Sequence, residues 1–254
     1  MTGILLSGCN GKMGKVITAA AANTDDIEMV GGIDLNTDAS AGYPVFASPA
    51  EVASEVIART DVIIDFSNPS AFAGLIEFAV KAAKPAVFAT TGLNEAQLTL
   101  LHHAADKIPV FFAANMSLGV SLISELAQKA AKVLGKDFDI EIVEMHHNQK
   151  VDAPSGTALM LADSIKEALG EDMRYEYDRH AKREKRGKNE IGIHSVRGGT
   201  ITGEHEIIFA GHDEIIKISH SARSKELFAT GAINAARFLC GKPAGLYGMK
   251  ELIG

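Results

Sequence analysis

Short apolar runs alternate with longer helical stretches through the first half of the chain, and this alternation limits the fold more than any other feature. The apolar runs predict strands over residues 4–7, 27–33, 61–65, 86–89 and 110–113. The stretches between them predict helices over residues 11–22, 49–57, 70–82 and 94–105. Strands that are apolar on both faces and separated by helices are typical of a parallel sheet with helices on both sides. We therefore expect an α/β domain at the start of the chain.

The pattern changes after residue 117. A long helix is predicted over residues 118–134, followed by a strand over 140–145 and a helix over 157–169. After a charged stretch come three strand-like runs, over residues 191–196, 200–210 and 215–221. Consecutive strands without intervening helices indicate an antiparallel or mixed sheet, so we expect a second domain of the α+β type.

Composition excludes several classes of protein. The net charge of −7 argues against a general nucleic-acid-binding surface. Residues 179–188 form a basic run that fits a nucleic-acid patch or a solvated loop; flanking acidic residues and the absence of interleaved aromatics favour the loop. No run approaches the roughly 20 apolar residues that span a bilayer, and no basic leader opens the chain. We therefore expect a soluble, cytoplasmic protein without nucleic-acid or membrane partners.

The first predicted turn is rich in glycine and reads Gly8, Cys9, Asn10, Gly11, Lys12, Met13 and Gly14. Such a turn brings bare backbone and the N-terminus of a helix to a pyrophosphate. Many strand-to-helix loops carry glycines without any ligand, so the turn alone is weak evidence. Asp34, however, ends the second predicted strand, where a carboxylate can hold the adenine ribose hydroxyls. Together these features predict a Rossmann-like, dinucleotide-binding domain.

Two later strand ends fit the same site, because ligands of open parallel sheets lie beyond the carboxyl ends of the strands. The candidates for contacts with the nicotinamide ribose are Ala89, Thr90, Thr91, Ala113, Ala114, Asn115 and Met116. Taken alone, these residues are equally well explained as turns. No Arg or Lys directly follows Asp34 to bind a 2′-phosphate, so we expect NADH as cofactor. Lys12 can reach such a phosphate, which leaves NADPH as a second cofactor.

The segment from Glu144 to Ala158 joins a predicted strand to a predicted helix. Pro154 suits a helix start, and Ser155 or Asp152 can cap the helix. The amide groups at this start and the Thr157 hydroxyl can bind a carboxylate. His146, His147 and Lys150 add mobile protons and positive charge nearby.

The histidines and the serine of this segment also fit different roles. A pair of histidines is more often a surface or packing feature than a catalytic one. A metal site would need a third partner or an H-E-x-x-H pattern, and neither is present, so we expect no metal. Ser155 also lacks the G-x-S-x-G pattern of a hydrolase nucleophile.

The run from Glu144 to Ala158 resembles the signature of the 4-hydroxy-tetrahydrodipicolinate (dihydrodipicolinate) reductase family, and the resemblance extends over nearly the whole chain. It implies that the proton donor is His146, that His147 contacts substrate, and that Lys150 is catalytic. It also implies that Gly156 and Thr157 bind a carboxylate of a small dicarboxylate substrate. The last helix, over residues 226–239, would return to the first domain, giving a dinucleotide domain of residues 1–116 and 226–254. Residues 117–225 would form the substrate and oligomerisation domain of a homotetramer.

The resemblance implies NAD(P)H-dependent reduction of 4-hydroxy-tetrahydrodipicolinate to tetrahydrodipicolinate and water, in the diaminopimelate route to lysine. Two alternatives belong to other classes. A regulator that senses NADH would not need the histidines and the lysine. Another reductase of the same architecture, such as a semialdehyde dehydrogenase, needs a nucleophilic cysteine, and neither Cys9 nor Cys240 is suitably placed.

Overall fold

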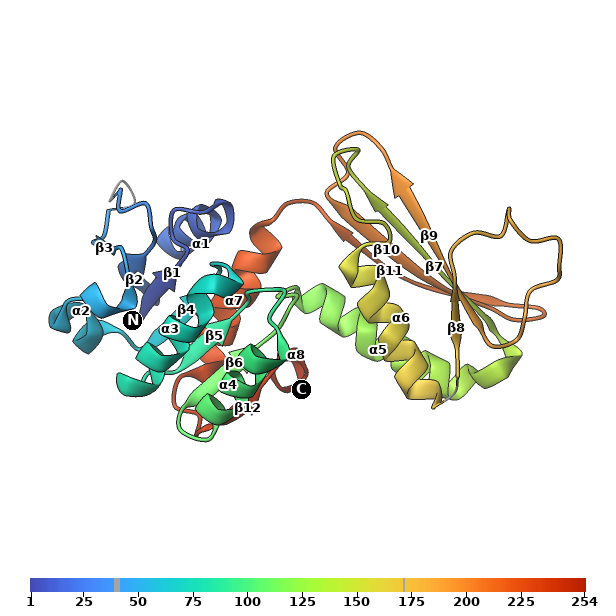
Figure 1. The fold of residues 1–254 in the computed structure, drawn as a ribbon. Helices are drawn as coiled ribbons and strands as arrows, with labels where there is room; N and C mark the ends of the chain where they lie inside the picture. The colour runs from blue at the N-terminus through green and yellow to red at the C-terminus, as the bar shows by residue number, and fades with distance from the viewer. Residues whose placement is uncertain (39–41, 171) are drawn as a thin grey trace. The chain divides into compact units, whose positions relative to one another are not determined.

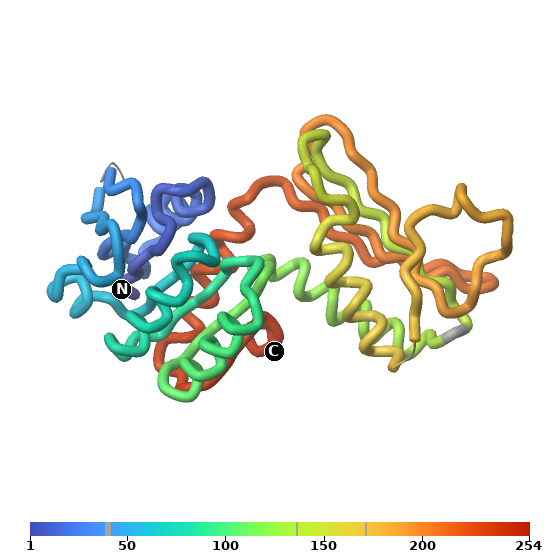
Figure 2. The backbone as a smooth tube through the Cα atoms, viewed as in Figure 1, coloured from blue at the N-terminus to red at the C-terminus, as the bar shows by residue number. Residues whose placement is uncertain are grey.

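The computed structural model describes residues 1–38, 42–170 and 172–254, with residue 136 described by its backbone alone. The chain divides into two compact units, each built on one β-sheet. Unit 1 contains Met1–Leu118 and Lys225–Gly254, and unit 2 contains Gly119–Ser224. Figure 2 shows the chain leaving unit 1 and returning to it, so that its C-terminal segment packs among the N-terminal strands and helices.

The sheet of unit 1 has the strand order β12-β6-β5-β4-β1-β2-β3, and every pair of neighbours is parallel. Its strands are β1 (Thr2–Ser7), β2 (Ile27–Ile33), β3 (Val45–Phe46), β4 (Val62–Asp65), β5 (Ala86–Phe88), β6 (Pro109–Phe112) and β12 (Gly245–Tyr247). The chain builds outward from β1 to β3 and then crosses back to β4 on the other side of β1. This reversal makes the carboxyl ends of β1 and β4 the topological switch point, where open α/β sheets bind ligands.

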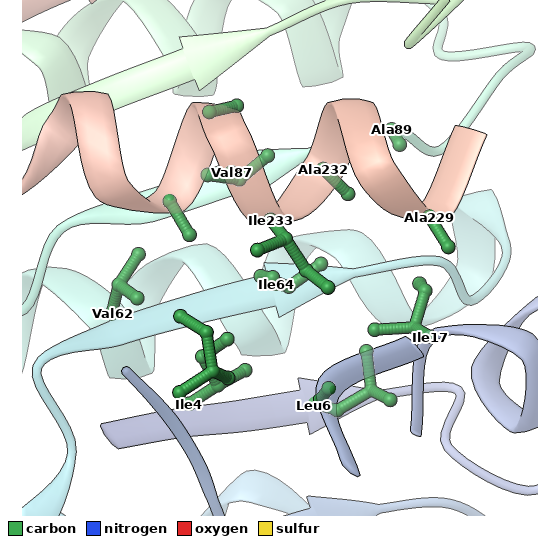
Figure 3. Close-up of a cluster of buried hydrophobic side chains, with 14 of the residues drawn as sticks. Ile4, Leu6, Ile17, Val62, Ile64, Val87, Ala89, Ala229, Ala232 and Ile233 are labelled. Carbon is green, nitrogen blue, oxygen red and sulfur yellow. The ribbon is translucent and has the colours of Figure 1, made fainter. Parts of the chain in front are cut away.

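Helices cover both faces of this sheet (Figure 1). α1 (Lys12–Ala22) and α7 (Glu226–Leu239) pack together on one face. Figure 3 shows Ala229, Ala232 and Ile233 of α7 against the apolar side chains of β1 and β4. The opposite face is covered by α2 (Ser54–Arg59), α3 (Pro69–Lys81) and α4 (Glu95–Ala105). Continuous apolar strands such as Val62–Asp65 follow from burial on both faces.

The sheet of unit 2 has the order β11-β10-β7-β9-β8. Its strands are β7 (Asp139–His146), β8 (Arg174–Glu176), β9 (Glu190–Arg197), β10 (Gly203–Ala210) and β11 (Ile215–Ala222). β9 runs parallel to β7 and β8, whereas β10 is antiparallel to β7 and β11, so the sheet is mixed. α5 (Leu118–Leu134) and α6 (Gly156–Leu169) pack on one face (Figure 1), and β7 accordingly alternates between buried and half-buried residues.

The predicted α/β fold with a second, mixed sheet is confirmed. The single helix predicted over residues 49–57 is wrong: a 3₁₀ turn (Pro49–Glu51) and α2 are separated by extended backbone at Val52 and Ala53. Val52 is buried in the core at this break. The strand predicted from residue 200 begins at Gly203, because the preceding turn includes Gly199 at a φ of +48°. The prediction also missed β3, β8, β12, the 3₁₀ turn Gly135–Asp137 and α8 (Met249–Ile253).

Candidate functional site

The glycine-rich turn of unit 1 is closed by its own backbone. Gly8 has a φ of +77°, which side chains disfavour. A Cβ atom on Gly14 would lie 2.2 Å from the Gly8 carbonyl oxygen and 2.4 Å from that of Cys9. Gly11 is the N-cap of α1; it offers no side-chain cap, and no acidic residue lies in the first turn of the helix. The start of α1 therefore suits an anionic ligand.

Asp34 lies beside this turn, as its place in the sequence predicts. One carboxylate oxygen accepts the Asn10 amide at 3.0 Å, and the other accepts the Asn36 amide at 3.0 Å. The Asn10 side chain binds the carbonyl oxygens of Asn36 and Asp38. These bonds join the turn after β1 to the loop after β2, so that the carboxylate and the helix start lie at one edge of the sheet.

A cavity of about 280 Å³ opens at the carboxyl ends of the strands of unit 1. It is lined by Met13, Phe66, Ser67, Ala89, Thr90, Thr91, Ala114, Met116 and Phe228. Six of these residues are among the predicted cofactor contacts. Ala113 and Asn115 do not line the cavity, and Asn115 instead accepts the Ser117 amide at 2.9 Å in the turn before α5. The cradle of bare backbone and this cavity fit a dinucleotide.

Unit 2 holds a second polar centre, in which the Glu144 carboxylate is completely buried. One of its oxygens lies 2.6 Å from His146 Nδ1. Arg197 binds both carboxylate oxygens, at 2.7 and 2.9 Å, and the Ser155 amide donates at 3.1 Å. Burial raises the pKa of Glu144, but hydrogen bonds from Arg197, Ser195, His146 and the Ser155 amide outweigh burial and bring the pKa to about 2.

The contact with Glu144 fixes His146. When Nδ1 donates to the carboxylate, Nε2 is the remaining nitrogen of the ring. Nε2 has no hydrogen-bond partner in the part of the chain that the structure describes, and it is not among the fully buried unpaired atoms. A Cβ atom on Gly203 would lie 3.1 Å from it. The contact with Glu144 thus holds the ring by Nδ1 and leaves Nε2 free of that contact.

His205 lies next to His146, with ring centroids 5.3 Å apart. Its Nε2 lies 2.9 Å from the Ser155 hydroxyl, and that hydroxyl accepts the Ala158 amide as the N-cap of α6. Burial, followed by the nearby charge of His146, lowers the pKa of His205 from 6.5 to about 4. His205 is therefore neutral near pH 7.

The remaining predicted substrate residues lie in the loop between β7 and α6. Lys150 Nζ forms an ion pair with Asp152 at 2.9 Å, and this contact is the first cause of the lowered pKa of Asp152. Of the two predicted caps, Ser155 caps α6 and Asp152 does not. Gly156 and Thr157 form the first turn of α6. His147 directly follows the buried His146 and is half-buried.

The basic run of residues 179–188 is, as expected, a loop in which most residues are exposed, but three of its basic side chains pair with carboxylates. Arg186 is largely buried; it binds Asp139 at 3.0 Å, Glu141 at 2.9 Å and the carbonyl oxygen of Ile140. Arg179 and Lys182 also pair with carboxylates. Within residues 1–38, 42–170 and 172–254, no helix is long and apolar enough to cross a membrane. The same residues contain no group of three or more His, Cys, Asp or Glu arranged to hold a metal ion.

Sequence reasoning missed several residues of both centres. Ser67 and Phe66 follow the third predicted strand, and the rule used for the neighbouring strand ends would have found them. Glu144 and Arg197 are 53 residues apart in sequence, and they meet because β7 and β9 are neighbours. His205 lies opposite Glu144 in the register of β10 with β7. Only strand pairing reveals these contacts.

Comparisons with known proteins give the same family for both halves of the chain. The family models described as dihydrodipicolinate reductase, N-terminus and C-terminus, match residues 2–116 and 119–253. The 4-hydroxy-tetrahydrodipicolinate reductase of Caldanaerobacter subterraneus subsp. tengcongensis is 51% identical over 253 residues, which cover 100% of this chain and 98% of the relative. That of Clostridium tetani is 47% identical, with coverages of 98% and 96%.

A solved structure agrees with these matches. Dipicolinate-bound dihydrodipicolinate reductase from Paenisporosarcina sp. TG-14 aligns with a TM-score of 0.80 at 26% identity, covering 99% of both chains. The glycine turn and the buried Glu144–His146 pair thus occur in a chain that matches one family along nearly its whole length. The chain belongs to the dihydrodipicolinate reductase family.

Proposed function

We propose that the protein reduces 4-hydroxy-tetrahydrodipicolinate to tetrahydrodipicolinate and water, with NADH or NADPH as the hydride donor. In the cell it would act in the cytoplasm, in the diaminopimelate route to lysine. The observation that carries the proposal is the His146 ring, which is held through Nδ1 by the completely buried Glu144 carboxylate. Full-length relatives named for this reaction support the choice of substrate.

In this proposal His146 or Lys150 supplies the proton with which the substrate hydroxyl leaves as water. Glu144 holds the tautomer that keeps a proton on Nδ1, and it stabilises the ring when Nε2 is also protonated. Lys150 brings a second proton and a positive charge from the adjoining loop. A proton donor beside an ion-paired lysine suits a step in which a hydroxyl leaves from an anionic substrate.

The start of α6 would bind a substrate carboxylate. The Ser155 hydroxyl accepts a hydrogen bond from the Ala158 amide, and Gly156 and Thr157 form the first turn of the helix. Amide groups and the helix dipole favour an anion at such a position, and the Thr157 hydroxyl adds a donor. His147 would contact the same substrate from the neighbouring loop.

Unit 1 would hold the dinucleotide, which supplies the hydride. The turn from Gly8 to Gly14 would bind the pyrophosphate, and Asp34 would bind the hydroxyl groups of the adenine ribose. The strand ends around the cavity would take the nicotinamide ribose. Thr37, in the loop after Asp34, is exposed, and no basic residue stands between Leu35 and Asp38. This loop favours NADH because it offers no positive charge to the 2′-phosphate of NADPH. The exposed Lys12 can bind that phosphate, which supports binding of NADPH as well.

We also propose a homotetramer that assembles through unit 2. α5 and α6 cover one face of its sheet (Figure 1). On the other face, Val143, Met145 and Ile208 are half-buried and Val196 is 43% exposed. A partner sheet on this face would cover those apolar side chains. Light scattering after size-exclusion chromatography would then give four times the mass of one chain.

The proposed reaction is tested by following NADH absorbance while dihydrodipicolinate synthase supplies the substrate in situ. We expect NADH to be consumed only when the synthase, its two substrates and this protein are all present. A protein that only senses NADH would bind it without consuming it. A different reductase would leave the synthase product unchanged, and either result would contradict the proposal.

A further inference from the structure

The carboxylate of Asp65 is completely buried at the end of β4, next to the topological switch point of unit 1. One oxygen accepts the Thr90 hydroxyl at 2.5 Å. The other accepts the Ser67 hydroxyl at 2.6 Å and the Ser67 amide at 3.1 Å. Three donors on one carboxylate match the hydrogen-bonding pattern of its ionised form, which can only accept.

No cationic side chain accompanies this carboxylate in the described part of the chain. Its hydrogen-bond donors are all neutral groups. Asn68, the N-cap of α3, begins a helix nearby, and the dipole of that helix offsets part of the negative charge. A buried charge without a counter-ion is costly, so it is usually paired with a cation or serves a ligand.

Both side chains held by Asp65 line the cavity of about 280 Å³. Thr90 and Ser67 give their hydroxyl protons to the carboxylate, so each oxygen keeps lone pairs that can accept from a ligand. The side chains of Ser67 and Thr90 therefore lie between the Asp65 charge and the cavity. Because their hydroxyl protons are used in the bonds to Asp65, both hydroxyl oxygens can act as acceptors towards a ligand. This arrangement suits a ligand that carries amide N–H groups and a positive charge.

We propose that Asp65 is a positioning residue that favours the oxidised, positively charged form of the nicotinamide ring over the reduced form. The inference rests on the proposed dinucleotide site and does not depend on the identity of the substrate. During reduction, a hydride with two electrons leaves the dihydronicotinamide ring for a substrate carbon, and a proton leaves with the substrate hydroxyl as water. The ring thereby gains one positive charge, and the fixed negative charge of Asp65 lowers the free energy of that state.

The test compares the dissociation constants of NAD⁺ and NADH in the wild type and in Asp65→Asn. NADH is titrated by its own fluorescence, and NAD⁺ by competition with NADH. Removing the charge should weaken NAD⁺ binding by about tenfold or more and leave NADH binding within about threefold, since only the oxidised ring is positively charged. Asp61→Asn is the matched control. Its exposed carboxylate accepts the Gly3 amide at the opposite end of β4, and it should leave both constants unchanged.

If Asp65→Asn weakens the binding of NAD⁺ and NADH equally, Asp65 only shapes the cavity. If both dissociation constants are unchanged, Asp65 has no role in binding. Either result overturns the inference. If Asp65→Asn lacks a cooperative thermal unfolding transition, Asp65→Ser is measured in the same way and must show the same change of ratio. Thr90→Val, which keeps the charge, should retain the wild-type ratio of the two constants. A wild-type protein that binds neither dinucleotide would overturn the proposed cofactor site itself.

Discussion

The candidate site of unit 1 is formed mainly by backbone, whereas that of unit 2 is formed by ionisable side chains. In unit 1, the turn from Gly8 to Gly14 is shaped by backbone and by the absence of side chains. In unit 2, Glu144, His146, Arg197 and His205 form a cluster of ionisable side chains, with Glu144 and His205 deeply buried. The first site should therefore be most sensitive to added volume, and the second to a change of charge at constant volume.

The largest effect should come from Glu144→Gln. The substitution keeps the shape of the side chain but leaves Arg197 without its carboxylate partner. Breaking a buried ion pair from one side costs about 3–5 kcal/mol. Urea unfolding followed by circular dichroism should show a loss of this size in the free energy of unfolding. The control Glu206→Gln, in the exposed pair with Lys217, should cost at most about 1 kcal/mol, and equal losses would contradict the comparison.

The buried histidine predicts a pH dependence. Because the pKa of His205 falls from 6.5 to about 4 on folding, the unfolded chain takes up a proton below pH 6.5 that the folded chain takes up only near pH 4. The free energy of unfolding should therefore decrease by roughly 3 kcal/mol as the pH falls from 6.5 to 4. Glu144 contributes at lower pH, because its stabilisation is present above 4.5 and is lost as the pH falls towards about 2.

His205→Gln should remove most of the decrease between pH 6.5 and 4. The measurement is a series of urea unfolding curves across this range for the wild type and the variant. The exposed His212, substituted by Gln, should leave the wild-type slope unchanged. A variant that keeps the full slope would show that His205 does not carry it.

The ionisable side chains of unit 2 should affect catalysis more than they affect cofactor binding. His146→Gln and Lys150→Ala should each lower kcat by at least about 100-fold, because each removes a proposed proton donor. NADH affinity should stay within a few-fold, since both residues belong to unit 2. His147→Gln should act mainly on KM. If His146→Gln and Lys150→Ala both keep near-normal kcat, the catalytic role proposed for this cluster is wrong.

Added volume tests the opposite side of the comparison. Gly14→Ala places a methyl group within 2.4 Å of two backbone oxygens, which should cost about 1–3 kcal/mol in stability or NADH affinity. Gly74→Ala is the matched control, because its Cβ would meet no atom within 4 Å and alanine is the better helix former. An equal loss in both variants would contradict the role of bare backbone in the turn.

The smallest effect concerns the choice of cofactor. NADH should be used at least as well as NADPH, because no basic residue stands next to Asp34. Asp34→Ala should raise the KM for NADH by about tenfold, the loss expected for a hydrogen bond to a charged group. Steady-state kinetics with both cofactors decide the point. A strong preference for NADPH that survives Asp34→Ala would contradict the assignment.

The two regions also differ in how far the sequence predicts them. Periodicity predicted the main helices and strands, and the glycine-rich turn together with two later strand ends pointed to six of the residues around the cavity of unit 1. The elements β3, β12 and α8 have five or fewer residues each, too short for a period to be visible.

The network of unit 2 depends on register. Alternation in β7 puts Glu144 on the buried face, and only the pairing of β7 with β9 and β10 brings Arg197 and His205 to it. Glu144 is in phase with the buried Ile140 and Ile142, so the alternation gives its face, but it does not show which distant residues pair with the carboxylate. Asp65 was hidden for a related reason: as the last residue of a buried strand, it gains Thr90 as a partner only through the packing of β4 beside β5.

The central claim is that hydride passes from the dinucleotide to a small dicarboxylate on this protein. Its most direct test uses NADH carrying two deuterium atoms at nicotinamide C4, with the synthase product as the second substrate. Mass spectrometry of the reduced product should show that one deuterium has been incorporated for each NADH oxidised. An unlabelled product, or NADH oxidation without a reduced dicarboxylate, would contradict the account.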